Sequence, residues 1–321
     1  MNILVTGGAG FIGSNFISHM LTKYENYKIV NYDLLTYAGN PNNLIHLKGY
    51  SNYKFVKGDI KDSIKVNQVL TDERIDCIVN FAAESHVDNS IRDPYVFIKT
   101  NVEGTMVLLN SALKNNIQKY IQISTDEVYG TIGNNEKFTE ESLIAPNSPY
   151  SASKAGADML ARAYHNTYGM PVNIIRSSNN YGPYQFPEKL IPLMIINAIN
   201  NKSLPVYGDG LQIRDWLYVK DNCAAIDLVL HRGENGEVYN VGGSSERTNL
   251  DVVRYILRYL NKDDSLISFV EDRLGHDRRY AVDCSKIMTV LGWRRENETF
   301  EKGLESTIQW YLDNQWWWEK L

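Results

Sequence analysis

Cysteine is scarce in this chain, and the few cysteines present are far apart. The 321 residues contain three, Cys77, Cys223 and Cys284, and no two of them form a CxxC pair. This spacing excludes a disulfide framework or a cysteine-ligated zinc site, so reduced and buried thiols are expected. The six histidines show no HExxH spacing, and no carboxylate cage accompanies them, so no metal site is predicted.

Long apolar runs and clusters of basic residues are also absent. No apolar run approaches the roughly 20 residues that span a bilayer, and the N-terminal ILVTGG lacks the segments of a signal peptide. Lys and Arg total 33 against 38 Asp and Glu, a formal net charge of −5, which argues against nucleic acid as the main partner. We therefore expect a cytoplasmic protein that acts away from membranes and nucleic acids.

Short β-branched runs alternate with amphipathic stretches through the first half of the chain. At 43% hydrophobic residues, the composition is typical of a globular protein with a substantial core. Strands are predicted at residues 2–6, 28–32, 53–57, 76–81, 119–124 and 172–176, and helices at 94–115 and 150–168. This alternation predicts an α/β fold, a Rossmann-type doubly wound parallel sheet that helices cover on both faces.

The second half of the chain is less regular. Residues 177–210 hold several of the nine prolines, and the strand–helix alternation lapses there. We predict a dinucleotide-binding domain over residues 1–176, with a later return at roughly 211–235. A smaller, partly interleaved C-terminal substrate domain is predicted over residues 177–321.

The first predicted strand runs directly into the turn TGGAGFIG. Its glycines Gly7, Gly10 and Gly13 form a GxxGxxG pattern, slightly different in spacing from the common GxGxxG. Such glycines permit a tight turn, close approach of the backbone to a pyrophosphate, and close packing of the following helix. Asp33 closes the next strand 20 residues after Gly13, where a carboxylate binds the ribose hydroxyls of NAD. We interpret the turn as an NAD site; the alternative is a glycine cluster beside a solvated acid.

Tyr150 and Lys154 form a YxxxK pair, although this spacing recurs elsewhere, for example at Tyr95 and Lys99. Tyr150 differs because it opens a long helical stretch after the fifth strand, and i, i+4 spacing places both side chains on one helix face. A cation about 4 Å away is expected to lower the phenol pKa from ~10 towards neutrality. The phenolate then takes a proton from a substrate alcohol whose carbon gives hydride to NAD⁺. The alternative, an exposed tyrosine and lysine, suits the other matches better.

Two adjacent acids follow the fifth predicted strand. Thr125, Asp126 and Glu127 stand at its C-terminal end, the edge at which open α/β sheets bind ligands. An acid and a base beside a redox tyrosine suit elimination of water from a sugar. Oxidation at C4 acidifies the C5–H, so that Glu127 removes this proton while Asp126 protonates the leaving C6 hydroxyl. The hydride then returns to C6, without net oxidation.

The placement of these acids depends on where the strand ends. Consecutive strand residues point to opposite faces, so both acids serve one site only if the strand ends by Thr125 or bends there. The alternative is a pair of loop acids that cap the following turn.

The most distinctive segments resemble the extended short-chain dehydrogenase/reductases, and among them the dTDP-glucose 4,6-dehydratase family. These segments are residues 33–40, 82–90, 124–130, 150–158, 177–192, 212–216 and 275–281. The TDE triplet is the discriminating part, because epimerases of the superfamily have small residues where Asp126 and Glu127 stand. The resemblance implies NAD-dependent dehydration of dTDP-glucose to dTDP-4-keto-6-deoxyglucose, a lyase activity in deoxysugar synthesis such as that of dTDP-rhamnose.

The resemblance also implies roles for individual residues. The implied catalytic residues are Thr125, Asp126, Glu127, Tyr150 and Lys154. The implied NAD site comprises Gly7, Gly10, Phe11, Ile12, Gly13, Asp33, Leu34, Thr36, Asp59, Ile60, Ala82, Ala83, Ser85, Thr100, Tyr150, Lys154 and Asn180. The implied substrate site comprises His86, Thr125, Asn179, Lys189, Leu190, Pro205, Tyr207, Arg214, Asn249, Arg273 and His276.

Other functions and one departure stay open at this point. A 4-epimerase or decarboxylase uses the same Tyr–Lys pair, and a non-catalytic NAD-sensing protein uses the same fold.

The resemblance implies a homodimer through helices 94–115 and 150–168. The family usually reads RPGHD where this chain has RLGHD, so Leu274 replaces a proline and is expected to loosen that loop without changing the reaction.

Overall fold

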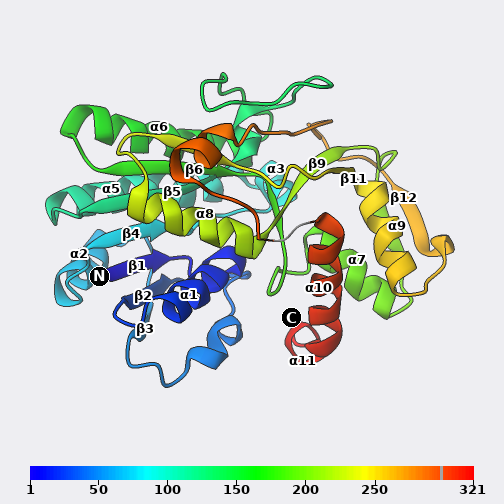
Figure 1. The fold of residues 1–321 in the computed structure, drawn as a ribbon, viewed down its shortest axis with the longest axis horizontal. Coiled ribbons are helices and arrows are strands. Elements are labelled where there is room, and N and C mark those ends of the chain that lie inside the picture. Colours follow the sequence, from blue (N-terminus) through cyan, green and yellow to red (C-terminus); the bar gives the residue numbers. More distant parts are fainter. Residues whose placement is uncertain (297–298) are drawn as a thin grey trace.

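A seven-stranded parallel sheet forms the central layer, at the left of Figure 1. The computed structural model describes residues 1–296 and 299–321. The strands are β1 (Asn2–Thr6), β2 (Lys28–Asp33), β3 (Tyr53–Lys57), β4 (Cys77–Asn80), β5 (Lys119–Thr125), β6 (Val172–Ser177) and β10 (Val238–Val241). Their order is β10-β6-β5-β4-β1-β2-β3, and every neighbouring pair is parallel. This sheet confirms the predicted fold class, and its order reverses between β1 and β4, where such sheets bind ligands.

Helices cover both faces of this sheet. They are α1 (Phe11–Lys23), α2 (Ser63–Asp72), α5 (Gly104–Lys114), α6 (Pro149–Tyr168) and α8 (Val219–Arg232). Ile3 and Val5 pack with α1 and α8 on one face, whereas Leu4 packs with α2 and α5 on the other. The three residues divide in this way because successive strand side chains point to opposite faces.

Shorter helical segments complete this layer. They are η1 (Pro41–Leu47), α3 (Val87–Arg92), α4 (Pro94–Phe97), η2 (Ile98–Glu103) and η3 (Asp126–Tyr129). The predicted helix 94–115 is therefore three consecutive segments, α4, η2 and α5, with a π-helical turn in the middle. The predicted helix 150–168 is α6.

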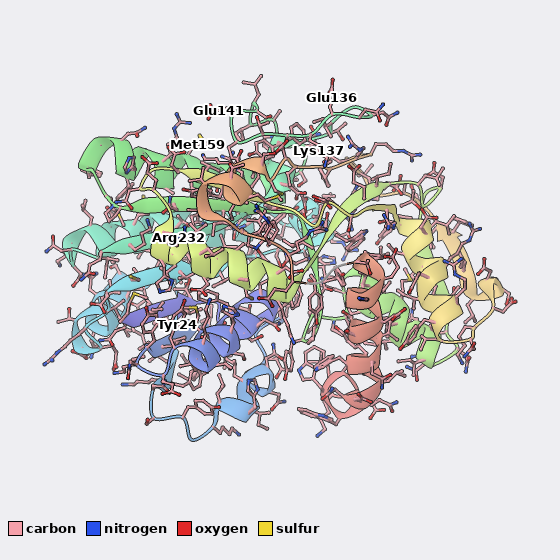
Figure 2. The ribbon with its side chains drawn as sticks, viewed as in Figure 1. Tyr24, Glu136, Lys137, Glu141, Met159 and Arg232 are labelled. Carbon is pink, nitrogen blue, oxygen red and sulfur yellow. The ribbon has the colours of Figure 1, made fainter. Side chains whose placement is uncertain are left out.

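A buried carboxylate joins α1 to α8. Asp227 of α8 accepts hydrogen bonds from Lys23 Nζ at 2.6 Å and from the Tyr24 hydroxyl at 3.0 Å. Figure 2 labels Tyr24 at the end of α1 and Arg232 at the end of α8. Burial alone would raise the pKa of Asp227, but the hydrogen bonds that it accepts hold this pKa well below its ordinary value. The charged contact therefore fixes α1, and the glycine turn before it, against a helix from the second half of the chain.

A smaller region with its own hydrophobic core lies beside the sheet layer (Figure 1, right). Its strands are β7 (Asn179–Tyr181), β8 (Leu204–Tyr207), β9 (Ile213–Tyr218), β11 (Glu246–Thr248) and β12 (Ile267–Val270). The helical segments of the rest of the chain are α7 (Leu190–Ile199), α9 (Asn249–Tyr259), η4 (Asp264–Leu266), η5 (Ile287–Leu291), α10 (Phe300–Asp313) and α11 (Gln315–Trp318). Although α8 and β10 follow residue 176, they belong to the sheet layer, and the domain limits stay a prediction. Among the described residues, no helix combines the length and apolar character needed to cross a membrane.

Candidate active site

The glycine turn leaves no room for side chains where β1 passes into α1. Gly7 has φ +66°, and a Cβ on it would lie 2.6 Å from the backbone nitrogen of Ala82. A Cβ on Gly13 would lie 2.5 Å from the Gly7 carbonyl oxygen. Only glycine fits this conformation and this close approach. The first amides of α1 therefore lie beside an open cavity, an arrangement that suits an anion such as a pyrophosphate.

Asp33 ends β2 on the far side of the same turn. Its carboxylate accepts hydrogen bonds from the backbone amides of Ala9 at 2.9 Å and Leu35 at 2.7 Å. Burial raises the pKa of Asp33, and these two amides oppose that rise. A carboxylate oxygen has two lone pairs, so each oxygen retains acceptor capacity for a ribose hydroxyl.

The residues of the predicted NAD site all line one cavity of about 320 Å³. It extends from the glycine turn and Asp33, past Ala82 and Thr100, to Tyr150 and Lys154. The glycine cradle at one end and a carboxylate at the end of the second strand are the features that a dinucleotide requires. The residues present therefore fit NAD, although their individual roles stay predictions.

The two adjacent acids leave the strand before they reach the site. β5 ends at Thr125, whose side-chain hydroxyl accepts a hydrogen bond from the backbone amide of Glu127 at 3.3 Å. Asp126 then begins the short helix η3. Because the strand has ended, Asp126 and Glu127 both line the first cavity. The alternation of a strand therefore does not separate the two acids.

The surroundings of the two acids raise their pKa values to different extents. Burial, together with the like charge of Glu127, raises the pKa of Asp126 well above its ordinary value. Burial also raises the pKa of Glu127, but Arg214 and Lys189 oppose that rise. Asp126 Oδ2 has no hydrogen-bond partner among the described residues. Cationic neighbours thus favour the anion of Glu127, while Asp126 holds its proton more firmly than usual, which suits Asp126 as the proton donor and Glu127 as the acceptor.

Tyr150 and Lys154 enter the site from the first turns of α6. Ser148 caps this helix in a capping box with Ser151, and Pro149 occupies its first position. Lys154 Nζ donates a hydrogen bond to the Ile123 carbonyl oxygen at 2.6 Å, and burial lowers the pKa of Lys154 to about 8. Both side chains are buried in the wall of the first cavity.

The structure contradicts the predicted net lowering of the Tyr150 pKa, whereas the stabilisation of the phenolate by Lys154 stays a prediction. Burial, followed by the charges of Glu127 and Asp126, raises the pKa of Tyr150 above its ordinary value, and Thr125 opposes this rise only in part. The ammonium of Lys154 is directed to a backbone carbonyl, and burial weakens its own hold on a proton. Desolvation and two neighbouring acids therefore determine the pKa of the phenol. The sequence prediction considered only the charge of Lys154 and its distance from Tyr150.

A second cavity of about 630 Å³ adjoins the first. Of the predicted substrate residues, it is lined by His86, Asn179, Lys189, Leu190, Pro205, Tyr207, Arg214, Asn249, Arg273 and His276. Thr125 lines the first cavity only, whereas Glu127 lines both. Four buried polar atoms in the wall of this second cavity lack a hydrogen-bond partner among the described residues: Asn179 Oδ1, Gln185 Oε1, Trp216 Nε1 and Asn249 Oδ1. Such atoms are available to a polar ligand.

Two cations of the second cavity are held firmly. Arg214 donates from Nη2 to the Asp277 carbonyl oxygen at 2.9 Å and lies 4.4 Å over the Tyr280 ring. Lys189 donates to the Ser85 carbonyl oxygen at 2.8 Å, and burial lowers its pKa. The cavity therefore presents positive charge from ordered side chains.

The two histidines of the predicted substrate site, His86 and His276, are largely buried, with side chains 18% and 7% exposed. His86 is the N-cap of α3, and its Nδ1 accepts from the Asn89 amide at 3.3 Å. His276 Nδ1 lies 2.6 Å from Asp272 Oδ1. Burial lowers the pKa of both histidines, so the neutral ring is favoured in each. Leu274 beside His276 is 77% exposed, so the residue that replaces the family proline packs little.

Several cavity residues were missed in the sequence analysis. They include Glu188 in both cavities, Phe186 in the first, and Asp88 and Tyr280 in the second. Glu188 and Phe186 lie inside a segment recognised as distinctive, and Asp88 follows His86 closely in another. The segments themselves were the available signal, but no spacing pattern singled out these members.

The chain is similar in sequence and in fold to known dehydratases. A family model described as GDP-mannose 4,6 dehydratase matches residues 4–307. A dTDP-glucose 4,6-dehydratase from Xanthomonas campestris is 52% identical over 98% of this chain and 94% of its own length. A dTDP-glucose 4,6-dehydratase from Bacillus anthracis, solved in complex with NAD, is 53% identical with a TM-score of 0.94, over 100% of this chain and 99% of its own. One from Streptomyces venezuelae, solved with NAD and TYD bound, is 47% identical with a TM-score of 0.97 and the same coverage.

Proposed function

Because the chain belongs to the dTDP-glucose 4,6-dehydratase family of extended short-chain dehydrogenase/reductases, we propose that it is an NAD-dependent lyase that converts dTDP-glucose to dTDP-4-keto-6-deoxyglucose. The resemblance seen in the sequence is confirmed by these relatives. One observation carries the proposal: Asp126 and Glu127 lie in one cavity wall with Tyr150 and Lys154, and Glu127 reaches the second cavity as well. An epimerisation at C4 has no use for this pair of acids.

The first step is a proton transfer at the C4 hydroxyl. NAD, when bound, supplies the chemistry of accepting hydride from C4 and returning it to C6. Tyr150 takes the proton of the C4 hydroxyl, and the charge of Lys154 stabilises the phenolate. Thr125 supports the same phenol, because its hydroxyl opposes the rise of the Tyr150 pKa that burial causes.

The second step is the elimination of water across C5 and C6. Glu127 removes the C5 proton, which the C4 ketone has made acidic, and Asp126 gives a proton to the C6 hydroxyl as it leaves. The strongly raised pKa of Asp126 and the cations Lys189 and Arg273 near Glu127 support these opposite roles. Addition of hydride at C6 leaves an enolate across C4 and C5, and Glu127 returns its proton to C5. The product is then the 4-keto-6-deoxy sugar, and no net oxidation of the sugar has occurred.

The nucleotide part of the substrate occupies the second cavity in this proposal. Arg214, Asn249, Arg273 and His276 hold the diphosphate and nucleoside, and a guanidinium suits a phosphate because its donors match two oxygens. Tyr207, with Pro205 beside it, contacts the thymine. The unpartnered Asn249 Oδ1 in this wall supports a polar ligand here.

Incubation with dTDP-glucose tests the proposal directly. The expected product is a 4-ketone with a characteristic absorbance in alkali, and dTDP-glucose should react faster than the UDP-, CDP- and GDP-hexoses. Recovery of dTDP-galactose alone would show a 4-epimerase, and loss of the C6 carbon from a uronic acid substrate would show a decarboxylase. Bound NAD without turnover of any nucleotide hexose would favour a sensing protein.

A homodimer is part of the same proposal. Large apolar side chains are exposed along α4, η2, α5 and α6, among them Tyr95 at 64%, Ile98 at 49% and Met159 at 42%. Figure 2 labels Met159 on the outer side of α6. Two copies packed through these helices would cover this apolar surface. Light scattering after size exclusion should give twice the chain mass, and Ile98→Glu should shift the species towards a monomer.

The pathway and cellular location belong to the proposal as well. We place the enzyme in the cytoplasm, where sugar nucleotides are made, and its product in deoxysugar synthesis such as that of dTDP-rhamnose. All three cysteines are free and buried, which supports a reducing compartment. Fractionation of cells that carry the native gene, with detection of the chain in each fraction, tests the location.

A further inference from the structure

A carboxylate and a guanidinium from opposite parts of the chain meet in the wall of the second cavity. Asp88 lies in the first turn of α3, beside the sheet layer, and Arg273 lies in the loop after β12. Arg273 Nε donates to Asp88 Oδ1 at 2.6 Å, and Arg273 Nη2 donates to Asp88 Oδ2 at 3.0 Å. This two-point contact fixes the plane of the guanidinium as well as its position.

The two-point contact uses one edge of the guanidinium and leaves another free. A guanidinium has five N–H donors, of which Asp88 takes one on Nε and one on Nη2. Both N–H groups of Nη1 and the second of Nη2 remain, and within residues 1–296 and 299–321 no hydrogen bond of Nη1 occurs. These remaining donors form the fork that matches two oxygens of a phosphate.

An aromatic ring and the surrounding charges complete the arrangement. The guanidinium carbon of Arg273 lies 5.3 Å from the centre of the Tyr207 ring, which holds one face of the group. His86 Nε2 is 3.8 Å from Asp88 Oδ2, but burial lowers the pKa of His86 and favours its neutral form. Arg273 is therefore the charged partner of Asp88, and both side chains are 22% exposed.

We propose that Asp88 is a positioning residue for substrate binding, which holds Arg273 by its Nε–Nη2 edge so that the Nη1–Nη2 edge binds the diphosphate. The inference rests on the proposed function, because it assumes that a nucleoside diphosphate occupies the second cavity. An arginine that is already ordered loses less side-chain freedom when a ligand binds. The neighbouring Leu274 has no proline ring to stiffen this loop, so the ion pair supplies order that the backbone lacks.

The pair of Arg278 and Asp209 provides a control. Arg278 Nη1 contacts Asp209 at 2.9 and 3.1 Å, and neither residue lines the second cavity among the residues described. Both pairs are ion pairs with an arginine from the segment after β12. Asp209→Asn therefore reports the general effect of removing such a carboxylate.

Binding of dTDP to the NAD-loaded protein tests the inference by calorimetry. Asp88→Asn should raise the Kd for dTDP and the KM for dTDP-glucose about tenfold, with kcat within about twofold of wild type. Thymidine, which has no phosphate, should bind wild type and Asp88→Asn equally. Asp209→Asn should leave all these quantities unchanged. An Asp88→Asn variant that binds dTDP as tightly as wild type, or more tightly, overturns the inference.

A variant of Arg273 itself separates the effect of its position from the effect of its charge. Arg273→Lys keeps the positive charge but has no second edge, so it should also lose about tenfold in dTDP affinity. Adding Asp88→Asn to Arg273→Lys should change the Kd less than about twofold, because the two residues act through one contact. If the losses of dTDP affinity in the two single variants add up in the double variant, Asp88 does not act through Arg273. If Asp88→Asn fails to fold, wild-type dTDP affinity in Arg273→Lys would contradict the positioning role. A wild-type protein that binds dTDP but forms no 4-ketone would refute the proposed function and leave this test intact.

Discussion

The Lys154 ammonium donates a hydrogen bond of 2.6 Å to the carbonyl oxygen of Ile123, two residues before Thr125. The helix that supplies the redox pair is thus joined to the strand that delivers the two acids. This contact fixes where Lys154 lies relative to Tyr150 and Glu127, and any shift of β5 would move both halves of the proposed chemistry together.

Replacing Lys154 removes this contact and the charge beside the phenol. Lys154→Met should lower kcat by about a hundredfold or more and move the ascending limb of the rate profile to higher pH, because the phenolate loses a stabilising cation. The pH profile of kcat/KM for dTDP-glucose provides the measurement. Lys99→Met is the matched control, since Lys99 has the same spacing from Tyr95 but lies 4.7 Å from the centre of its ring and lines neither of the two cavities formed by the described residues. An unshifted profile in Lys154→Met would disprove the tuning of Tyr150.

The two acids should be dispensable for the first half of the reaction. Asp126→Asn combined with Glu127→Gln should still transfer hydride from C4, and the reduced cofactor should accumulate because the elimination cannot follow. Stopped-flow absorbance in the reduced-nicotinamide band measures this accumulation, and overall turnover should fall by about a thousandfold. Glu141→Gln, on the loop labelled in Figure 2, is the control and should turn over normally. Normal dehydration by the double variant would remove both acids from the mechanism.

The Asp126 carboxyl should lower the free energy of unfolding at neutral pH compared with a neutral side chain of the same shape. Its folded pKa is raised above the ordinary 3.8, so its stabilising contribution is complete only below that value and is lost as pH rises through the folded pKa. Asp126→Asn mimics the neutral acid and should therefore raise Tm by at least about 2 °C near neutral pH. Below pH 3.8 the gain should vanish, because the carboxyl is then neutral in the folded and unfolded chain. Calorimetric scans across this range would contradict the argument if the gain were independent of pH.

The loop after β2 is tied across the first cavity to the segment before α7. The Tyr37 hydroxyl donates to Glu188 Oε1 at 3.2 Å, and the Tyr37 and Phe186 rings meet edge to face at 5.6 Å. Because Phe186 and Glu188 line the predicted NAD cavity, this bridge should slow the escape of NAD. Tyr37→Ala should raise the dissociation rate of NAD about tenfold, measured by dilution with enzymatic detection of the released cofactor. Tyr50→Ala, which changes an exposed tyrosine outside the cavity, should release NAD at the wild-type rate; equal rates in both variants would exclude the bridge.

Local patterns predicted the sheet and its ligand-binding edge well. The predicted strands 2–6 and 53–57 coincide with β1 and β3, and the others differ from the observed strands by one residue at one or both ends. The glycine turn and Asp33 were predicted because their roles depend on backbone geometry and on a fixed distance along the chain. The TDE triplet was recognised because its position directly after a buried strand determines which edge it reaches.

The features that local patterns missed depend on contacts between distant segments. Asp88 and Arg273 are 185 residues apart, and no periodicity relates them. The raised pKa of Tyr150 was missed because desolvation and neighbouring acids depend on how the whole chain packs around the phenol. Lys154 donates to the backbone carbonyl oxygen of Ile123. Every residue type has such a carbonyl, so the sequence gives no signal for this contact.

The edge strand β10 joins β6 through the register Val238–Ile174, and α8 packs beneath it on the same face as α1. A gene that ends after residue 176 would encode a fragment without β10 and α8. The backbone of β6 would then be unpaired at the edge of the sheet, and part of one sheet face would be exposed, so the fragment should aggregate. The nucleotide-sugar half cannot be exchanged for another by simple fusion. New substrate preferences in such a protein must arise by substitutions within one continuous gene, not by shuffling of ready-made parts.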